Sequence, residues 1–141
     1  MSKRQSELFL FDIFVAIVKI EKTASKFKDS QNLLHSYTDW DSVIREFEII
    51  GEASKHLLKA DVLEKEHRSV VDFRNIIVHE YFGIDSEEVW DIIHNDLKTF
   101  KDMIIQLIDL LEINLKTELI DTYIEDNQYL DFVVSALRAL K

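Results

Sequence analysis

Apolar residues recur at intervals of three and four along most of the chain, which is the spacing of a buried helix face. Over residues 5–27 this stripe includes Leu10, Phe14 and Ile17. Other apolar residues fall between them, so the predicted first helix is hydrophobic on nearly every side. Such a helix has to be covered from several directions, and a second chain would be a natural source of cover.

The same spacing predicts three more helices and a shorter amphipathic stretch. The second helix is expected over residues 39–58 and the third over 63–79. The fourth is expected to run without a break from Asp85 or Ser86 to about Leu115. Its start carries a local signal, because an acidic residue followed three positions later by Glu is typical of a capping box.

The remaining residues, 117–141, contain a fifth amphipathic stretch around Phe132, Val133 and Leu137. We therefore predict an all-α fold, an up-and-down helical bundle of four to five helices. Residues 1–116 would form the bundle, and residues 117–141 would form a C-terminal helical extension. That extension would either pack on the bundle or dock a partner, and packing is the commoner role of an amphipathic helix.

Composition supports helices joined by short loops, since the 141 residues include only two glycines and no proline. Cysteine is absent, which excludes disulfides, a thiolate nucleophile and a Cys-based zinc site. The first residues are polar, and Asp12 interrupts the apolar run that follows. That run is too short for a membrane span and lacks the features of an export signal, so a cytoplasmic location is expected.

The net charge of −10 is concentrated in one part of the chain. Residues 1–84 carry 14 acidic and 12 basic side chains, whereas residues 85–126 carry 12 acidic and 3 basic ones. Binding of nucleic acid through bulk electrostatics needs a basic face, so no DNA partner is expected. Any chemistry on RNA would have to come from a local site in the nearly neutral first part.

One short stretch combines residue types suited to phosphodiester cleavage. Arg74, Asn75, His79 and Tyr81 fall within eight positions at the expected end of the third helix. Arginine offers a planar, permanently charged fork of donors to phosphate oxygens, and histidine can exchange a proton near neutral pH. Charge stabilisation and proton transfer are the two requirements of this reaction.

The spacing within this stretch also bears on assembly. At 100° per residue, His79 would lie roughly 140° around a straight helix from Arg74. The two side chains would converge if the helix ended near His79, or if a second chain supplied its own pair across a groove. Each chain has one such histidine, and transesterification uses both a base and an acid, which a symmetric dimer would provide.

The surrounding residues, 73–85, closely resemble the signature of the HepT-like branch of the HEPN superfamily, as does Val89-Trp90 just downstream. Upstream, residues 45–53 resemble the second-helix motif of that branch at the expected distance. The resemblance covers about residues 8–114, and the tail after Leu115 is not part of it.

This resemblance implies a helical bundle that dimerises with its motifs facing each other across a cleft. It implies a metal-independent endoribonuclease without a cofactor, acting as a toxin beside an antitoxin of the minimal nucleotidyltransferase type. Carried over by position, Arg74 and His79 would be the catalytic pair and Asn75 a supporting residue. Tyr81 would accept AMP from the antitoxin, and the added bulk and charge would block RNA at the cleft.

A second functional class remains open beside the toxin. The chain could be a non-catalytic HEPN-type module that binds a nucleotide or a protein and serves mainly as a substrate for AMP transfer. The Arg-to-His spacing and the following tyrosine favour the ribonuclease, while the acidic charge favours the binding module. A third hypothesis is a helical scaffold dimer with no catalytic activity, which the two matched motifs disfavour.

Other candidate groups are interpreted as structural. The spacings Glu64-x-x-His67 and Asp91-x-x-His94 are similar to those of di-metal bundles, but such a site needs two further inward carboxylates. Solvated helix faces explain them better, and no metal is predicted. The two remaining histidines are interpreted as surface or boundary residues, and both tryptophans as core residues: His35, His56, Trp40 and Trp90.

Overall fold

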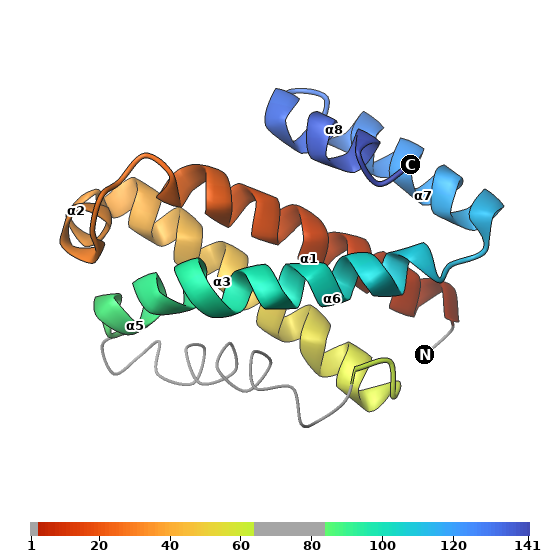
Figure 1. Ribbon diagram of the computed structural model, residues 1–141, viewed down its shortest axis with the longest axis horizontal. Coiled ribbons are helices and arrows are strands. Elements are labelled where there is room, and N and C mark those ends of the chain that lie inside the picture. Colours follow the sequence, from red (N-terminus) through yellow and green to blue (C-terminus); the bar gives the residue numbers. More distant parts are fainter. Residues whose placement is uncertain (1–2, 64–83) are drawn as a thin grey trace.

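A computed structural model of the chain describes residues 3–63 and 84–141, and their regular structure is entirely helical (Figure 1). The predicted all-α fold class is therefore confirmed. The helices, in chain order, are α1 (Lys3–Ala24), α2 (Ser30–His35), α3 (Tyr37–Lys59), α5 (Ser86–Asp91), the π-helical turn η2 (Ile92–Asp96), α6 (Leu97–Asp109), α7 (Ile113–Asp126) and α8 (Asp131–Arg138).

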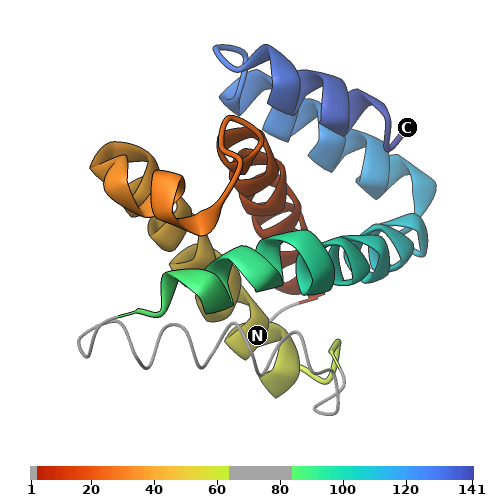
Figure 2. The ribbon, with the colours of Figure 1, turned by 60° about the vertical axis from the view of Figure 1, so that its left-hand side comes forward.

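Helix α1 is the centre of the molecule and contacts α3, α6, α7 and α8 (Figures 1 and 2). All its apolar residues from Leu10 to Ala24 are buried, and Phe11, Ile13, Ile17 and Ile20 are each fully inaccessible to solvent. The all-round hydrophobicity read from the sequence is thus satisfied within one chain. A second chain is not needed to cover these residues, and homodimerisation stays a prediction.

The first two long helices agree with the sequence pattern. Helix α1 was expected over residues 5–27 and α3 over residues 39–58, within a few residues of their observed bounds. Between them the structure adds the short helix α2, which the pattern did not predict. Its start is capped by Asp29, whose side chain accepts a hydrogen bond of 2.8 Å from the backbone N–H of Asn32. The predicted third helix, 63–79, lies outside the described residues except at Leu63.

The start of the predicted fourth helix is confirmed. Asp85 caps α5, and its Oδ1 accepts hydrogen bonds from the backbone N–H groups of Glu87 at 2.9 Å and Glu88 at 3.4 Å. The helix then continues through the wider turn η2 into α6. Ser30 of α2 donates a hydrogen bond to the Glu87 carboxylate, which ties α5 to the short helix beside it.

The expectation that this helix continues to about Leu115 is wrong, because α6 ends at Asp109. The apolar spacing continues through the break, but Leu110 is 81% exposed. Glu112 starts a new helix there, since its carboxylate accepts hydrogen bonds of 3.0 Å from the backbone N–H groups of Asn114 and Leu115. A side-chain acceptor at this place satisfies donors that a helix start would otherwise leave unpaired.

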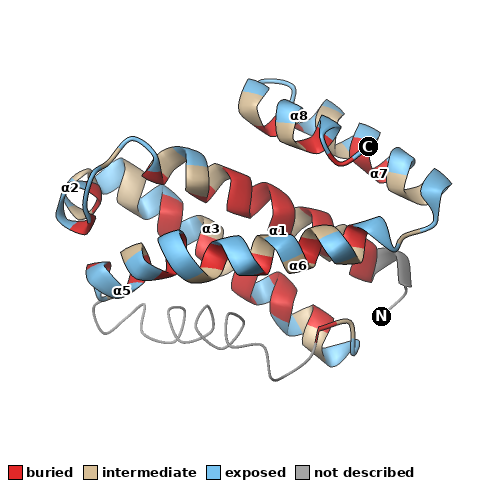
Figure 3. Ribbon diagram, viewed as in Figure 1, coloured by how far each residue is buried: buried red, intermediate tan, exposed pale blue. Residues whose placement is uncertain are grey.

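The C-terminal residues form two helices, α7 and α8, which pack together as a hairpin on α1 (Figure 1). The buried residues of the hairpin lie on the side that faces the rest of the protein (Figure 3). They are Leu119, Ile120, Asn127, Val133, Leu137 and Leu140. The predicted amphipathic stretch corresponds to α8, while α7 was missed as a separate helix and crosses position 116. Division of the chain into 1–116 and 117–141 stays a prediction.

None of the described helices combines the length and the apolar character required to span a lipid bilayer.

Candidate functional site: a pocket on α3 beside the Arg–His motif

The four residues singled out by sequence, Arg74, Asn75, His79 and Tyr81, lie outside the described residues. Their mutual arrangement therefore stays a prediction. The described part of the chain flanks them on both sides, with Ile84 only three positions after Tyr81 in the sequence.

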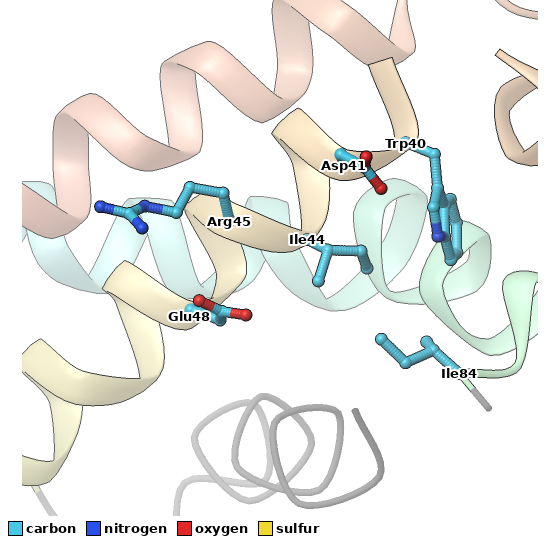
Figure 4. A pocket seen from close by; sticks show the side chains of 6 residues that line it. All are labelled: Trp40, Asp41, Ile44, Arg45, Glu48 and Ile84. Atoms are coloured by element: carbon cyan, nitrogen blue, oxygen red, sulfur yellow. The ribbon is translucent and has the colours of Figure 1, made fainter. Parts of the chain in front are cut away.

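Ile84 lines a pocket of about 420 Å³ whose other described lining residues all come from α3 (Figure 4). This volume falls in the range of small-ligand sites, roughly 300–1,000 Å³. Two of the α3 residues lie within the segment 45–53 that resembles a family motif, and three lie within the five positions before it. They are Trp40, Asp41, Ile44, Arg45 and Glu48.

These residues lie on α3 in two neighbouring rows, because side chains four positions apart share a helix face. One row contains Trp40, Ile44 and Glu48, and the other contains Asp41 and Arg45. Figure 4 shows the Trp40 ring and the Ile44 side chain on the side of the pocket nearest Ile84.

The pocket combines an apolar surface with ionic groups of both signs. Ile44 is buried, Trp40 and Glu48 are half-buried, and Asp41 and Arg45 are exposed. An aromatic ring can stack on a planar ligand, and a guanidinium can bind a phosphate. The Asp41 carboxylate accepts hydrogen bonds, so the pocket suits a ligand that has a flat ring, N–H donors and an anionic group.

Sequence reasoning missed this pocket, because Trp40 was interpreted as a core residue. The ring does pack against the core, but it is half-buried and also lines the pocket. The regular spacing of Trp40, Ile44 and Glu48 is the sequence feature that relates these pocket residues to one another. It places them on one face of a helix, but does not say that part of this face stays open.

A second group of titratable side chains lies between α1, α3 and α7 around a cavity of about 200 Å³. Burial raises the pKa of Asp12 above its usual range, partly offset by a hydrogen bond from Tyr123. Burial also raises the pKa of Glu46, against the opposing effects of Lys19 and Arg45. These groups sit at the junction of the C-terminal hairpin with the bundle, where they bear on stability.

The Asp91 and His94 pair shows no metal-binding arrangement. The Asp91 Oδ1 accepts a hydrogen bond of 2.6 Å from Asn95, and His94 Nδ1 lies 2.8 Å from the Trp90 carbonyl oxygen. Both contacts stay within one helical stretch. In the part of the chain that the structure covers, no group of His, Asp and Glu residues could hold a metal ion.

The other histidines that the structure describes agree with their structural interpretation. His56 stacks on Phe9, with ring centroids 4.6 Å apart, and its Nε2 lies 3.8 Å from the Glu52 carboxylate. His35 is exposed at the end of α2. The predicted pair Glu64 and His67 lies outside the described residues.

Comparison with known proteins identifies relatives of this chain. The model of the family described as "Ribonuclease HepT-like" matches residues 13–107. A "Putative RNase" of Methanocaldococcus jannaschii is 35% identical over 108 residues, which is 72% of this chain and 94% of the relative. A "Probable ribonuclease HepT" of Thermococcus cleftensis is 33% identical over 102 residues, covering 70% and 92% respectively. No solved structure matches the chain.

Proposed function

Because the chain belongs to the HepT-like ribonuclease family, we propose that it is a metal-independent endoribonuclease whose catalytic pair is Arg74 and His79. The observation that carries this proposal is the family match over residues 13–107, which spans both sequence motifs. The relatives named as ribonucleases support the same class of reaction.

The proposed reaction is an intramolecular transesterification of RNA. The ribose 2′-hydroxyl attacks the adjacent phosphorus, and the bond from phosphorus to the 5′ oxygen of the next nucleotide breaks. The products are a 2′,3′-cyclic phosphate and a free 5′-hydroxyl. Arg74 stabilises the negative charge that builds up on the phosphate, while one His79 takes the proton of the 2′-hydroxyl and another protonates the leaving oxygen.

Two histidines are needed in these roles, and each chain supplies one at this motif, so the proposed active form is a homodimer with a shared cleft. Asn75 helps to orient the catalytic pair. The spacing of Arg74 and His79 supports this assembly, because on a straight helix the two side chains of one chain would point in different directions. Because most apolar residues of α1 are buried within one chain, we expect other surfaces to form most of the dimer interface.

In the cell, we place the enzyme as the toxin of a toxin–antitoxin pair, with a minimal nucleotidyltransferase as its partner. The partner transfers AMP from a nucleoside triphosphate to the Tyr81 hydroxyl, which loses its proton as pyrophosphate leaves. The added phosphate and nucleoside then repel and obstruct RNA. This role rests on family resemblance, and sequencing of the adjacent reading frame tests it directly.

One observation favours a second candidate, the non-catalytic module that is a substrate for AMP transfer. The net charge of −10 gives no general attraction for RNA. This candidate predicts AMP on Tyr81 without any RNA cleavage.

The decisive experiment incubates the full chain with total RNA in the presence of a metal chelator. We expect cleavage that leaves cyclic-phosphate ends, and loss of cleavage in the Arg74→Ala/His79→Ala protein. Matched controls are Arg138→Ala and His35→Ala, which remove the same residue types at exposed positions and should cut normally. Cleavage that survives in the double variant overturns the assignment of the site. No cleavage by the wild type, with intact Tyr81 by mass spectrometry, overturns the ribonuclease.

A further inference from the structure

The pocket between α3 and Ile84 is lined by an aromatic ring, aliphatic side chains and charged groups of both signs. We propose that it holds one unpaired nucleotide of the RNA, with the base against Trp40 and Ile44, and that it prefers guanine. This inference rests on the proposed function for its choice of RNA as the substrate class. It adds a specificity site on residues separate from Arg74 and His79.

Size and surface both suit a single base. Eight residues separate Trp40 from Glu48, so the pocket extends about 12 Å along α3 at 1.5 Å per residue. Its volume of about 420 Å³ is small for a folded partner and adequate for a mononucleotide. Trp40 offers an aromatic face and Ile44 an apolar floor, the combination on which proteins stack unpaired bases.

The charged side chains give the pocket its preference for guanine. Asp41 lies next to Trp40 in the sequence and brings an exposed carboxylate to the pocket. A carboxylate accepts two parallel hydrogen bonds from a ligand that presents adjacent N–H donors. Guanine presents such a pair on its Watson–Crick edge, at the ring N–H and the amino group. Adenine and cytosine offer an amino group beside a ring acceptor, and uracil flanks its single N–H with two oxygens.

The same groups exclude other forms of nucleic acid. In a duplex the Watson–Crick edge of guanine is already paired, so the Asp41 carboxylate would meet no free donors. Arg45 is the single basic residue among the described lining residues, against two acidic ones, so the pocket does not attract a run of phosphates. We expect one phosphate contact, at Arg45. Binding of single-stranded RNA should therefore weaken only slightly with salt, with a logarithmic slope near −0.7.

Tryptophan fluorescence tests this site directly, because the chain has only two tryptophans. Trp90→Phe leaves Trp40 as the single emitter, and a base stacked on it should quench its emission. The full chain carrying this change is titrated with guanosine, adenosine, cytidine and uridine 5′-monophosphates. We expect guanosine monophosphate to bind at least about fivefold more tightly than each of the others, as one lost hydrogen-bonding partner would give.

Two further variants assign the contacts. Asp41→Asn, at an exposed position, should lower the affinity for the guanine nucleotide about tenfold and leave the uridine nucleotide unchanged. Asp91→Asn makes the same chemical change at an exposed residue outside the pocket and should alter nothing. Arg45→Ala should weaken the binding of all four nucleotides to a similar extent, because each loses the same phosphate contact. Trp40→Phe removes the emitter, so its binding is measured by titration calorimetry, and it should bind more weakly by a few-fold.

The outcomes separate this site from the ribonuclease proposal. Absence of quenching, equal affinity for all four nucleotides, or an unchanged guanine affinity in Asp41→Asn overturns the site, whether or not the chain cuts RNA. Selective binding by a protein that cuts no RNA supports the site and overturns the ribonuclease. Where cleavage is observed, its products should map next to guanine, and Asp41→Asn should relax that preference without abolishing cleavage.

Discussion

Tyr123 of α7 donates a hydrogen bond to Asp12 of α1, with 2.7 Å between its Oη and the Asp12 Oδ1. The same hydroxyl oxygen lies 3.0 Å from the carbonyl oxygen of Leu8. These contacts join the C-terminal hairpin to the central helix across 111 residues of sequence. Burial and the neighbouring carboxylate raise the pKa of Tyr123 far above its usual value, so the phenol stays protonated as the donor.

Removal of this hydroxyl should loosen the hairpin. We expect Tyr123→Phe to lower the free energy of unfolding by about 1–3 kcal/mol, because half-buried Asp12 loses its hydrogen-bond partner. Urea denaturation at neutral pH measures the change. Tyr129→Phe is the matched control, since Tyr129 is 75% exposed and should tolerate the same substitution. Equal stability of Tyr123→Phe and the wild type would show that the hydrogen bond contributes nothing net.

The raised pKa values of Asp12 and Glu46 predict a pH dependence of stability. A carboxyl whose pKa is higher in the folded protein binds its proton more tightly there than in the unfolded chain. Its contribution is therefore fully present below the unfolded values, 3.8 for Asp12 and 4.5 for Glu46, and is lost as the pH rises through the higher folded values. Their ionisation at neutral pH destabilises the fold.

We expect Asp12→Asn and Glu46→Gln each to gain stability relative to the wild type as the pH rises from about 4 towards 7. Each variant is compared with the wild type at every pH, so that the contributions of other titrating groups to the free energy of unfolding cancel. Asp39 is one of these, because its hydrogen bond from Lys26 lowers its pKa. Urea unfolding curves across this range measure the difference. A difference that stays constant with pH would contradict the raised pKa of that residue.

The sequence could predict α1, α3 and the start of α5 because their signals are local. The stripe of Leu10, Phe14 and Ile17 and the cap at Asp85 depend only on residues a turn or two apart, and the structure confirms both. The break after Asp109 was hidden because apolar residues continue the helical period through it. The signal that was missed is Glu112, whose carboxylate accepts a hydrogen bond from the backbone N–H of Asn114 and so caps the start of α7.

Contacts between segments that are distant in the sequence could not be predicted from local sequence signals. Asp12 is visible in the sequence only as a polar interruption of an apolar helix, and nothing in its neighbourhood identifies Tyr123 as its partner. The cover of α1 likewise depends on how residues 113–141 fold back. For the candidate site, spacing places Trp40 and Arg45 on α3, but which helix faces stay open is decided by the packing around them. The residues Arg74, Asn75, His79 and Tyr81 stay predictions from the motif.

The cap at Asp85 should contribute measurably to the helix that begins beside the proposed site. We expect Asp85→Ala to lower the free energy of unfolding by about 0.5–2 kcal/mol, because two backbone N–H groups lose their acceptor. Asp85→Ser keeps a capping oxygen and should lose far less. Amide hydrogen exchange at Glu87 and Glu88 locates the effect. An unchanged exchange rate in Asp85→Ala would mean that neighbouring contacts, rather than the cap, hold this helix start.

The C-terminal hairpin should be part of the cooperative fold, since it covers α1. Leu137 of α8 is fully buried, and Leu137→Ala should lower the free energy of unfolding by about 2–5 kcal/mol through lost burial and a cavity. Leu110→Ala removes the same atoms at a position that is 81% exposed and should stay within about 0.5 kcal/mol of the wild type. Urea denaturation followed by circular dichroism measures both.

The shape of the Leu137→Ala transition distinguishes a shared core from an independent appendage. A single transition at lower urea means that α8 unfolds together with the bundle, as expected from the contacts of α1 with both hairpin helices. An early, partial loss of helix followed by an unchanged main transition would mean that the hairpin detaches by itself. In that case the detached state exposes the apolar face of α1, and gel filtration at rising protein concentration should show self-association that Leu110→Ala does not.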